Sequence, residues 1–168
     1  DINFGNSVAI SGDLIVVGDW ADNMGAVGAG SAYVYDLGSS SPAVPVATLN
    51  DPGPLPRDYF GQSVAVSGHC MIVGAPCDDT RLIGSGYDSS SAYVYDLSSA
   101  TPTVPVVTLR NPSRVGIDRF GYSVAISGNL ILVGAPYDST LAPGAGTAYV
   151  YDLTSATPTV PFAILNNP

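Results

Sequence analysis

The sequence predicts an all-β protein built from three copies of one four-stranded unit. The composition is rich in Val, Ile, Tyr, Thr, Gly and Pro, whereas Glu and Lys, two strong helix formers, are absent. The string FGNSVAISGDLIVVGDW at 4–20 also returns with few changes at 60–76 and at 120–136. Self-similarity at a spacing of this length is typical of repeat architectures such as propellers.

Each copy contains four runs of residues that resemble β-strands, described here for the first copy. Residues 7–11 alternate small and branched side chains, as a half-buried strand does. Residues 14–17 are apolar throughout, so both faces of this strand must be covered. Residues 31–37 alternate again and keep a pair of tyrosines in every copy. Residues 44–49 contain Pro45, which is tolerated only at strand ends and sheet edges.

These four runs predict an antiparallel meander whose last strand is the outer edge. A Ser-Gly-x turn joins the first two strands as a tight hairpin. One such sheet cannot stand alone because its second strand needs cover on both faces, and radial stacking of equal sheets supplies that cover. We therefore expect a β-propeller with one blade in each of 1–59, 60–119 and 120–168. The alternative repeat fold, a β-helix, has shorter coils and lacks tight hairpins.

The charge pattern excludes some classes of partner. The formal net charge is −9, and the five Arg residues form no basic run, which argues against binding to nucleic acid. Gly, Ser or Asp interrupts every apolar run before it reaches the roughly 18 residues of a membrane span, so no membrane insertion is expected.

The repeated motif resembles a known family. Phe-Gly-x-Ser-Val-Ala followed by Val-Gly-Ala-Pro, at 60–76 and 120–136, is similar to the FG-GAP repeat of integrin α-subunit propellers and of bacterial surface proteins. The resemblance implies a propeller with an adhesive role outside the cell or at its surface. The first copy departs from the motif, with Asp19 and Trp20 in place of Ala-Pro. The calcium loop of integrin-type repeats is not carried over, because the Ser-Gly-x turn is too short to surround the ion.

Three blades are too few for a closed propeller ring, which usually has roughly four to eight. The two end blades would each expose an apolar sheet face. We therefore expect either a homo-oligomer, as a dimer with six blades or a trimer with nine, or a segment of a longer propeller.

A binding surface is expected where the long and unequal loops gather. The connections after the second and the fourth strand of each blade share one face, and loops on a rigid scaffold commonly carry binding residues. Aromatic and Arg side chains, which are favoured at recognition hot spots, break the repeat there. The candidate ligand-binding residues are Asp19, Trp20, Arg57, Tyr59, Arg81, Tyr87, Arg114, Arg119 and Tyr137. For Trp20, a purely structural role at the strand end is the alternative.

Calcium is the only cofactor considered. Four aspartates follow the second strand in Gly-rich loops, and carboxylates with loop carbonyls are calcium ligands. These candidates are Asp22, Asp78, Asp79 and Asp138. The alternative is that they stabilise turns through hydrogen bonds to the backbone. Asp58 and Asp118, just before Phe-Gly, are expected to bind turn amides rather than a metal.

Three hypotheses for function remain. The first is a non-enzymatic module of an extracellular or cell-surface protein that binds a protein or glycan through the long-loop face. The second is a structural building block that assembles into a ring or array. A glycan-acting enzyme using Asp78 or Asp79 is the third, but nothing distinguishes these carboxylates from their repeat equivalents. The only histidine, His69, lies in a hairpin turn on the opposite face, so no catalytic residues are expected.

Overall fold

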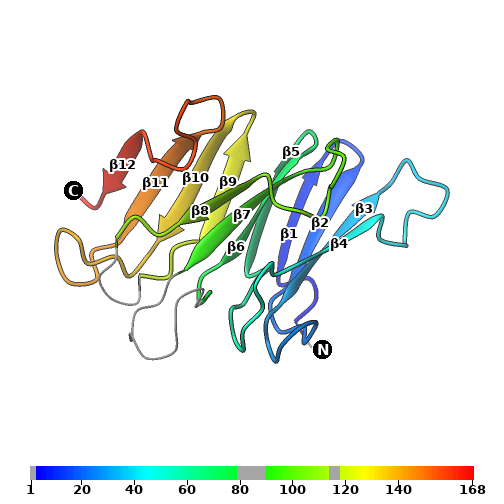
Figure 1. Cartoon of the computed structure of the whole chain (residues 1–168), viewed down its shortest axis with the longest axis horizontal. Helices are drawn as coiled ribbons and strands as arrows, with labels where there is room; N and C mark the ends of the chain where they lie inside the picture. Colours follow the sequence, from blue (N-terminus) through cyan, green and yellow to red (C-terminus); the bar gives the residue numbers. More distant parts are fainter. Residues whose placement is uncertain (1–2, 79–89, 114–117) are drawn as a thin grey trace.

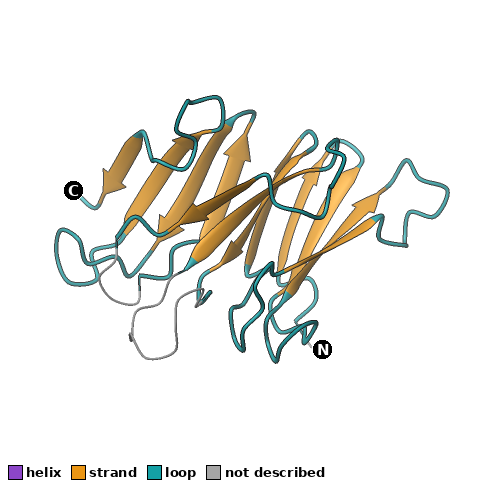
Figure 2. Cartoon of the chain, viewed as in Figure 1, coloured by secondary structure: helices purple, strands orange, loops and turns teal. Residues whose placement is uncertain are grey.

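The fold, described from a computed structural model, consists of three four-stranded antiparallel sheets arranged as neighbouring blades (Figure 1 and Figure 2). The structure describes residues 3–78, 90–113 and 118–168. Within these ranges every regular element is a strand. No helix in the described part of the chain is long and apolar enough to cross a membrane.

Each sheet pairs its strands in the order of the sequence, so the predicted meander is confirmed. The first sheet contains β1 (Ser7–Ser11), β2 (Leu14–Asp19), β3 (Ser31–Asp36) and β4 (Ala47–Asn50). The second contains β5 (Ser63–Ser67), β6 (Cys70–Ala75), β7 (Ser91–Asp96) and β8 (Val107–Arg110). The third contains β9 (Ser123–Ser127), β10 (Leu130–Ala135), β11 (Thr147–Asp152) and β12 (Ala163–Asn166).

The fourth strand of each blade is shorter than predicted. In the first blade it begins at Ala47 rather than at Val44. Pro45 lies before it, and the first backbone hydrogen bond of this segment to β3 comes from the N–H of Val46, which donates to the carbonyl of Val34 at 2.7 Å. Proline cannot donate to the sheet, so pairing starts only after it.

The blades meet through their first strands, which lie side by side as β1, β5 and β9 (Figure 1). The β2–β3 loop, the β10–β11 loop and the linker 51–62 between the first and second blades lie at the lower edge of the molecule in this view, opposite the tight hairpins. For the described loops, the predicted separation of long loops and short turns onto opposite faces is therefore confirmed.

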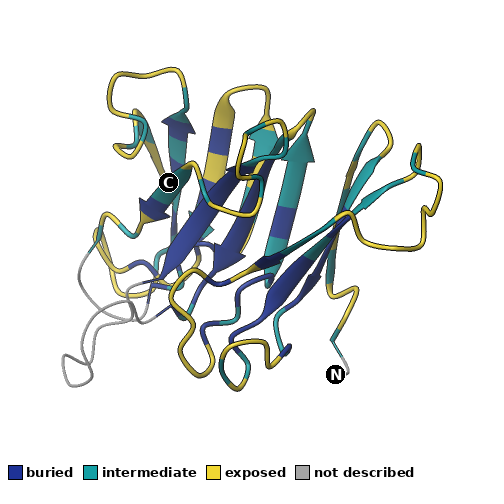
Figure 3. Cartoon of the chain, turned by 45° about the vertical axis from the view of Figure 1, so that its right-hand side comes forward, coloured by how far each residue is buried: buried dark blue, intermediate teal, exposed yellow. Residues whose placement is uncertain are grey.

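The core lies in the two interfaces between neighbouring blades. The first seam is the interface between the first and second blades, and the second seam is the interface between the second and third blades. One cluster joins Val34 and Leu49 of the first blade to Met71 and Tyr95 of the second. A second cluster joins the other face of the middle blade to the third blade around Phe120. The two central strands of the middle blade, β6 and β7, are accordingly buried over nearly their whole length, as the apolar second strand requires (Figure 3).

The glycines of the repeated motif allow the blades to approach closely. Gly61, of Phe-Gly, has φ of +87° and lies where an added Cβ would be 2.3 Å from the Ser31 carbonyl oxygen of the preceding blade. Gly18, at the end of β2, lies where a Cβ would be 2.1 Å from the carbonyl oxygen of Gly61. A side chain at either position would force the two sheets apart.

Candidate functional site

The long-loop face brings together two of the predicted aromatic residues. The ring of Trp20, just after β2, meets the ring of Tyr59 edge-on with 4.9 Å between centroids. Tyr59 lies in the linker to the second blade, and its N–H donates to the carbonyl of Gly28 at 3.2 Å. The pair therefore connects a loop of the first blade to the linker, and both rings are partly exposed.

Arg57 and Tyr59 share an uncommon backbone conformation. Their φ angles are 71° and 58°, in the left-handed region that residues other than glycine seldom adopt. The N–H of Arg57 donates to the carbonyl of Val27 at 2.9 Å, which fixes this turn against the β2–β3 loop. Such backbone strain is concentrated at functional sites in proteins. Arg57 is exposed and lies two residues before Tyr59 in the same linker.

The next linker repeats part of this arrangement with different chemistry. Arg119 occupies the position of Tyr59 in the repeat, also has positive φ, at 52°, and lies 5.4 Å from the ring centroid of Tyr137. This is a cation–π contact, and Tyr137 is mostly exposed. Each of the two linkers thus places one large recognition-type side chain at the same loop edge.

The remaining predicted ligand-binding residues are either buried or not described. Asp19 is buried at the end of β2, and its carboxylate accepts a hydrogen bond from the N–H of Ala21 at 3.3 Å. Arg81, Tyr87 and Arg114 lie outside the described residues.

The aspartates predicted as metal candidates accept hydrogen bonds from the repeated tyrosines. Tyr hydroxyls donate to these carboxylates in all three blades: Tyr33 to Asp22, Tyr93 to Asp78 and Tyr149 to Asp138. The other oxygen of Asp22 and of Asp138 accepts a backbone N–H two residues ahead, from Met24 and Thr140. These contacts give the carboxylates a structural role in the turn. The fourth candidate, Asp79, lies outside the described residues.

These contacts also shift the acidity of the first pair. Burial alone would raise the pKa of Asp22, but the hydrogen bonds from Tyr33, Ser31 and the backbone outweigh it and lower the pKa below 3.8. Burial and the neighbouring Asp22 raise the pKa of Tyr33 to about 12. The carboxylate is therefore the charged acceptor and the phenol the donor at neutral pH.

The first seam contains an acidic cluster that the sequence pattern did not reveal. Asp51, Asp58 and Asp78 each offer one carboxylate oxygen, and these oxygens all lie within 4.8 Å of one another. All three side chains are buried. Burial and the charges of Asp78 and Asp58 raise the pKa of Asp51 to about 7, although the N–H of Gly53 donates to it at 2.8 Å.

Sequence analysis assigned two of these three residues differently. Asp78 was a metal candidate, Asp58 was expected to bind turn amides, and Asp51 was not singled out. Asp58 does accept the N–H of Leu55 at 2.5 Å, as a turn residue would. The one sequence feature that could have singled out Asp51 is that the equivalent residue of the next copy is Asn111.

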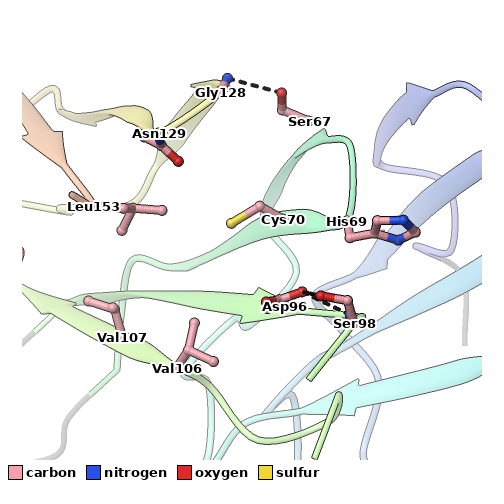
Figure 4. Close-up of a pocket in the computed structure, with 10 residues that line it drawn as sticks. All are labelled: Ser67, His69, Cys70, Asp96, Ser98, Val106, Val107, Gly128, Asn129 and Leu153. Atoms are coloured by element: carbon pink, nitrogen blue, oxygen red, sulfur yellow. Dashed lines mark hydrogen bonds between the residues drawn. The ribbon is translucent and has the colours of Figure 1, made fainter. Parts of the chain in front are cut away.

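The opposite face carries a hollow of about 470 Å³ between the second and third blades, lined in part by His69, Cys70 and Asp96 (Figure 4). His69 and Cys70 are neighbours at the start of β6, and their side chains point away from each other (Figure 4). Burial, and to a smaller extent the charge of Asp96, raises the pKa of the Cys70 thiol. This arrangement does not activate the thiol as a nucleophile.

Two solved structures with a similar fold are distant from this chain in sequence. The computationally designed protein Ika4 matches 98% of this chain and 71% of its own, with a TM-score of 0.52 and 16% identity. Raptor from Chaetomium thermophilum matches 96% of this chain but only 12% of its own, with a TM-score of 0.57 and 9% identity. At these identities the likeness shows the fold alone. No protein of curated function gives a match.

The repeat itself identifies the family. The FG-GAP repeat matches residues 2–35, 45–95 and 115–151, which together make up most of the chain. These matches contain the motif glycines that let neighbouring blades approach, and each falls mainly within one of the three sheets. The chain therefore belongs to the FG-GAP repeat family.

Proposed function

We propose that the chain is a non-enzymatic propeller module of an extracellular or cell-surface protein, and that it binds a protein or glycan partner through its long-loop face. The observation that carries this proposal is the edge contact between Trp20 and Tyr59, with the exposed Arg57 in the same linker. The extracellular location is the usual one for FG-GAP repeats.

The chemistry of this surface suits recognition better than catalysis. Trp, Tyr and Arg contribute most of the binding energy at many interfaces, and aromatic rings also stack on sugar faces. A glycan-acting role for Asp78 has less support, because Tyr93 donates a hydrogen bond to it and its side chain is buried.

Binding to a glycan array and to immobilised cell-surface proteins tests this proposal. Trp20→Ala and Arg57→Ala are expected to weaken a positive signal roughly tenfold or more. Thr101→Ala is the matched control, because Thr101 is exposed in the β7–β8 loop away from this face. A partner that binds all three variants equally well would contradict the proposed surface.

A second candidate function, assembly with further blades, is favoured by the exposed ends. Phe4 on the outer face of the first blade is 53% exposed, whereas its equivalent Phe60 in the first seam is fully buried. Leu165 on the outer face of the third blade is also 53% exposed, whereas its equivalent Leu49 is fully buried. The two end faces are therefore the two halves of one seam, and each suits another blade in the same orientation.

Polar contacts across the seams support the same continuation. The hydroxyl of Ser7 donates to the carbonyl of Gly61 at 2.7 Å, and that of Ser63 donates to Gly121 at 2.8 Å. By the same pattern, the Ser123 hydroxyl of the third blade would donate to the carbonyl of a glycine equivalent to Gly5 in an added blade.

Light scattering tests the assembly. Two or three times the chain mass of 17.1 kDa is expected if copies of this chain supply the missing blades. Phe4→Asp is expected to dissociate that assembly by placing a charge in the new seam. If the 168 residues fold only as part of a longer chain, the added blades belong to the same polypeptide. A folded monomer of 17.1 kDa would contradict the assembly.

A further inference from the structure

We propose that Asp51, Asp58 and Asp78 bind one divalent cation of the calcium type in the seam between the first and second blades. This inference is independent of the partner-binding surface proposed above. It also concerns a different place from the β1–β2 hairpin, where the turn is too short to surround an ion.

The three carboxylates come from separate segments. Asp51 directly follows β4, Asp58 lies in the linker to the second blade, and Asp78 follows β6. Their nearest oxygens lie within 4.8 Å of one another. Two oxygens on opposite sides of a calcium ion have about that separation, since calcium–oxygen distances are roughly 2.3–2.6 Å.

All three carboxylates of the cluster are buried, which strengthens the repulsion among them. Asp58 and Asp78 are fully buried, and Asp51 is 4% exposed. Like charges at this separation repel inside a protein, and a cation bound between the three carboxylates would offset that repulsion.

Asp51 has one buried carboxylate oxygen that no hydrogen-bond donor of the described residues reaches. Its Oδ1 accepts the N–H of Gly53 at 2.8 Å. Its Oδ2 is buried and accepts no hydrogen bond from the described residues. A buried carboxylate oxygen normally has a donor or a metal ion as its partner. This unpartnered oxygen points to a ligand that completes the site.

In the second seam, the residue equivalent to Asp51 is Asn111, and both polar atoms of its side chain are hydrogen-bonded. Asn111, Asp118 and Asp138 occupy the three equivalent positions there. The amide Nδ2 of Asn111 donates to Oδ2 of Asp118 at 3.0 Å. One carboxylate of the first seam is thus replaced by a neutral donor in the second. The first seam therefore has one more carboxylate than the second, and calcium affinity depends on the number of charged ligands.

Calcium fits this donor set better than softer metals. The ligands are carboxylate oxygens, which hard cations prefer, and among the described residues neither a histidine nor a thiol belongs to the cluster. Three carboxylates leave further coordination positions for backbone carbonyls and water, since calcium takes about six to eight oxygens.

Isothermal titration calorimetry of the chelator-treated 168-residue chain with calcium chloride tests the site. One ion per chain is expected, together with a higher melting temperature in calcium than in chelator. Asp51→Asn should weaken binding roughly tenfold or more. This variant is expected to fold because Asn stands at the equivalent position of the second seam. Asp13→Asn is the matched control, since it removes one charge at an exposed hairpin where the third copy has Asn129.

The reverse substitution tests whether three aspartates suffice. Asn111→Asp recreates the cluster in the second seam and should raise the stoichiometry to two ions per chain. A stoichiometry that stays at one would overturn the assignment of these positions as ligands. The absence of both binding heat and a calcium-dependent melting temperature in the unmodified chain would overturn the site altogether. Equal calcium affinity of Asp51→Asn and the unmodified chain would place any bound ion elsewhere and overturn it too.

Discussion

The Ser7 hydroxyl donates a 2.7 Å hydrogen bond to the Gly61 carbonyl oxygen of the next blade, and that same oxygen lies 2.1 Å from where a Cβ at Gly18 would be. The two motif glycines therefore meet backbone to backbone across the seam. Gly18→Ala should destabilise the chain by about 3 kcal/mol or more, because the obstructing atom is main chain and cannot rotate away. Urea denaturation measures the loss.

Gly134→Ala is the internal control for this prediction. Gly134 holds the same motif position in the third blade, but a Cβ there would come closest to the side-chain oxygen of Ser123, at 2.3 Å. A Ser hydroxyl can rotate, so the cost in the isolated chain should be about 1 kcal/mol. Equal losses for the two variants would mean that another blade already covers the third sheet.

Substitution of one repeated leucine distinguishes a position buried in a seam from the equivalent position on an exposed end face. Leu49→Ala creates a cavity in the first seam, where the side chain is fully buried, and should cost about 2–5 kcal/mol. Leu165→Ala removes the equivalent, largely exposed side chain and should cost less than about 1 kcal/mol. Thermal unfolding of the two variants beside the unmodified chain gives the comparison. A large loss at Leu165 would contradict an exposed end face.

The blade architecture could be predicted from the sequence because the residue pattern of each strand indicates whether that strand is buried or lies at an edge. Only a strand covered on both faces explains an apolar run such as 14–17, and only an edge tolerates Pro45. The repeat then places every loop on its face without further information. The start of the fourth strand was misplaced because the proline rule locates an edge and not the residue where pairing begins.

The acidic cluster could not be predicted in the same way. Asp51 and Asp78 lie far apart in the sequence, and their approach depends on how one blade packs against the next. Alignment of the repeats reveals that position 51 differs from position 111. It does not reveal that Asp58 lies close to Asp51 and Asp78. The contact between Trp20 and Tyr59 is of the same kind, since a repeat pattern cannot indicate which departures from it meet in space.

The Tyr–Asp bond of each blade should contribute measurably to stability. Tyr149 donates to Asp138, which is fully buried. Tyr149→Phe leaves that carboxylate oxygen without its donor and should cost about 1–3 kcal/mol in urea denaturation. Tyr122→Phe removes the hydroxyl of an exposed ring and serves as the control, with little change expected. Equal stability of the two variants would show that water replaces the lost donor.

The loss of stability at alkaline pH should reveal the equivalent hydrogen bond of the first blade, from Tyr33 to Asp22. Burial, and then the hydrogen bond to Asp22 and its charge, raise the pKa of Tyr33 from 10.0 to about 12. Because the folded chain holds this proton more tightly than the unfolded chain, the stabilisation is fully present below pH 10.0 and is lost as the pH rises through about 12. The free energy of unfolding should therefore fall over this interval.

Tyr33→Phe isolates that contribution from those of the other tyrosines. The variant lacks the titrating phenol and should be less stable than the unmodified chain at neutral pH, by about 1 kcal/mol for a partly exposed hydrogen bond. Its stability should fall less steeply between pH 10.0 and about 12, so that the two curves converge at the upper end. Urea denaturation at a series of pH values gives both curves. Parallel curves would mean that Tyr33 has the same proton affinity in the folded and the unfolded chain, and that its bond to Asp22 does not stabilise the blade.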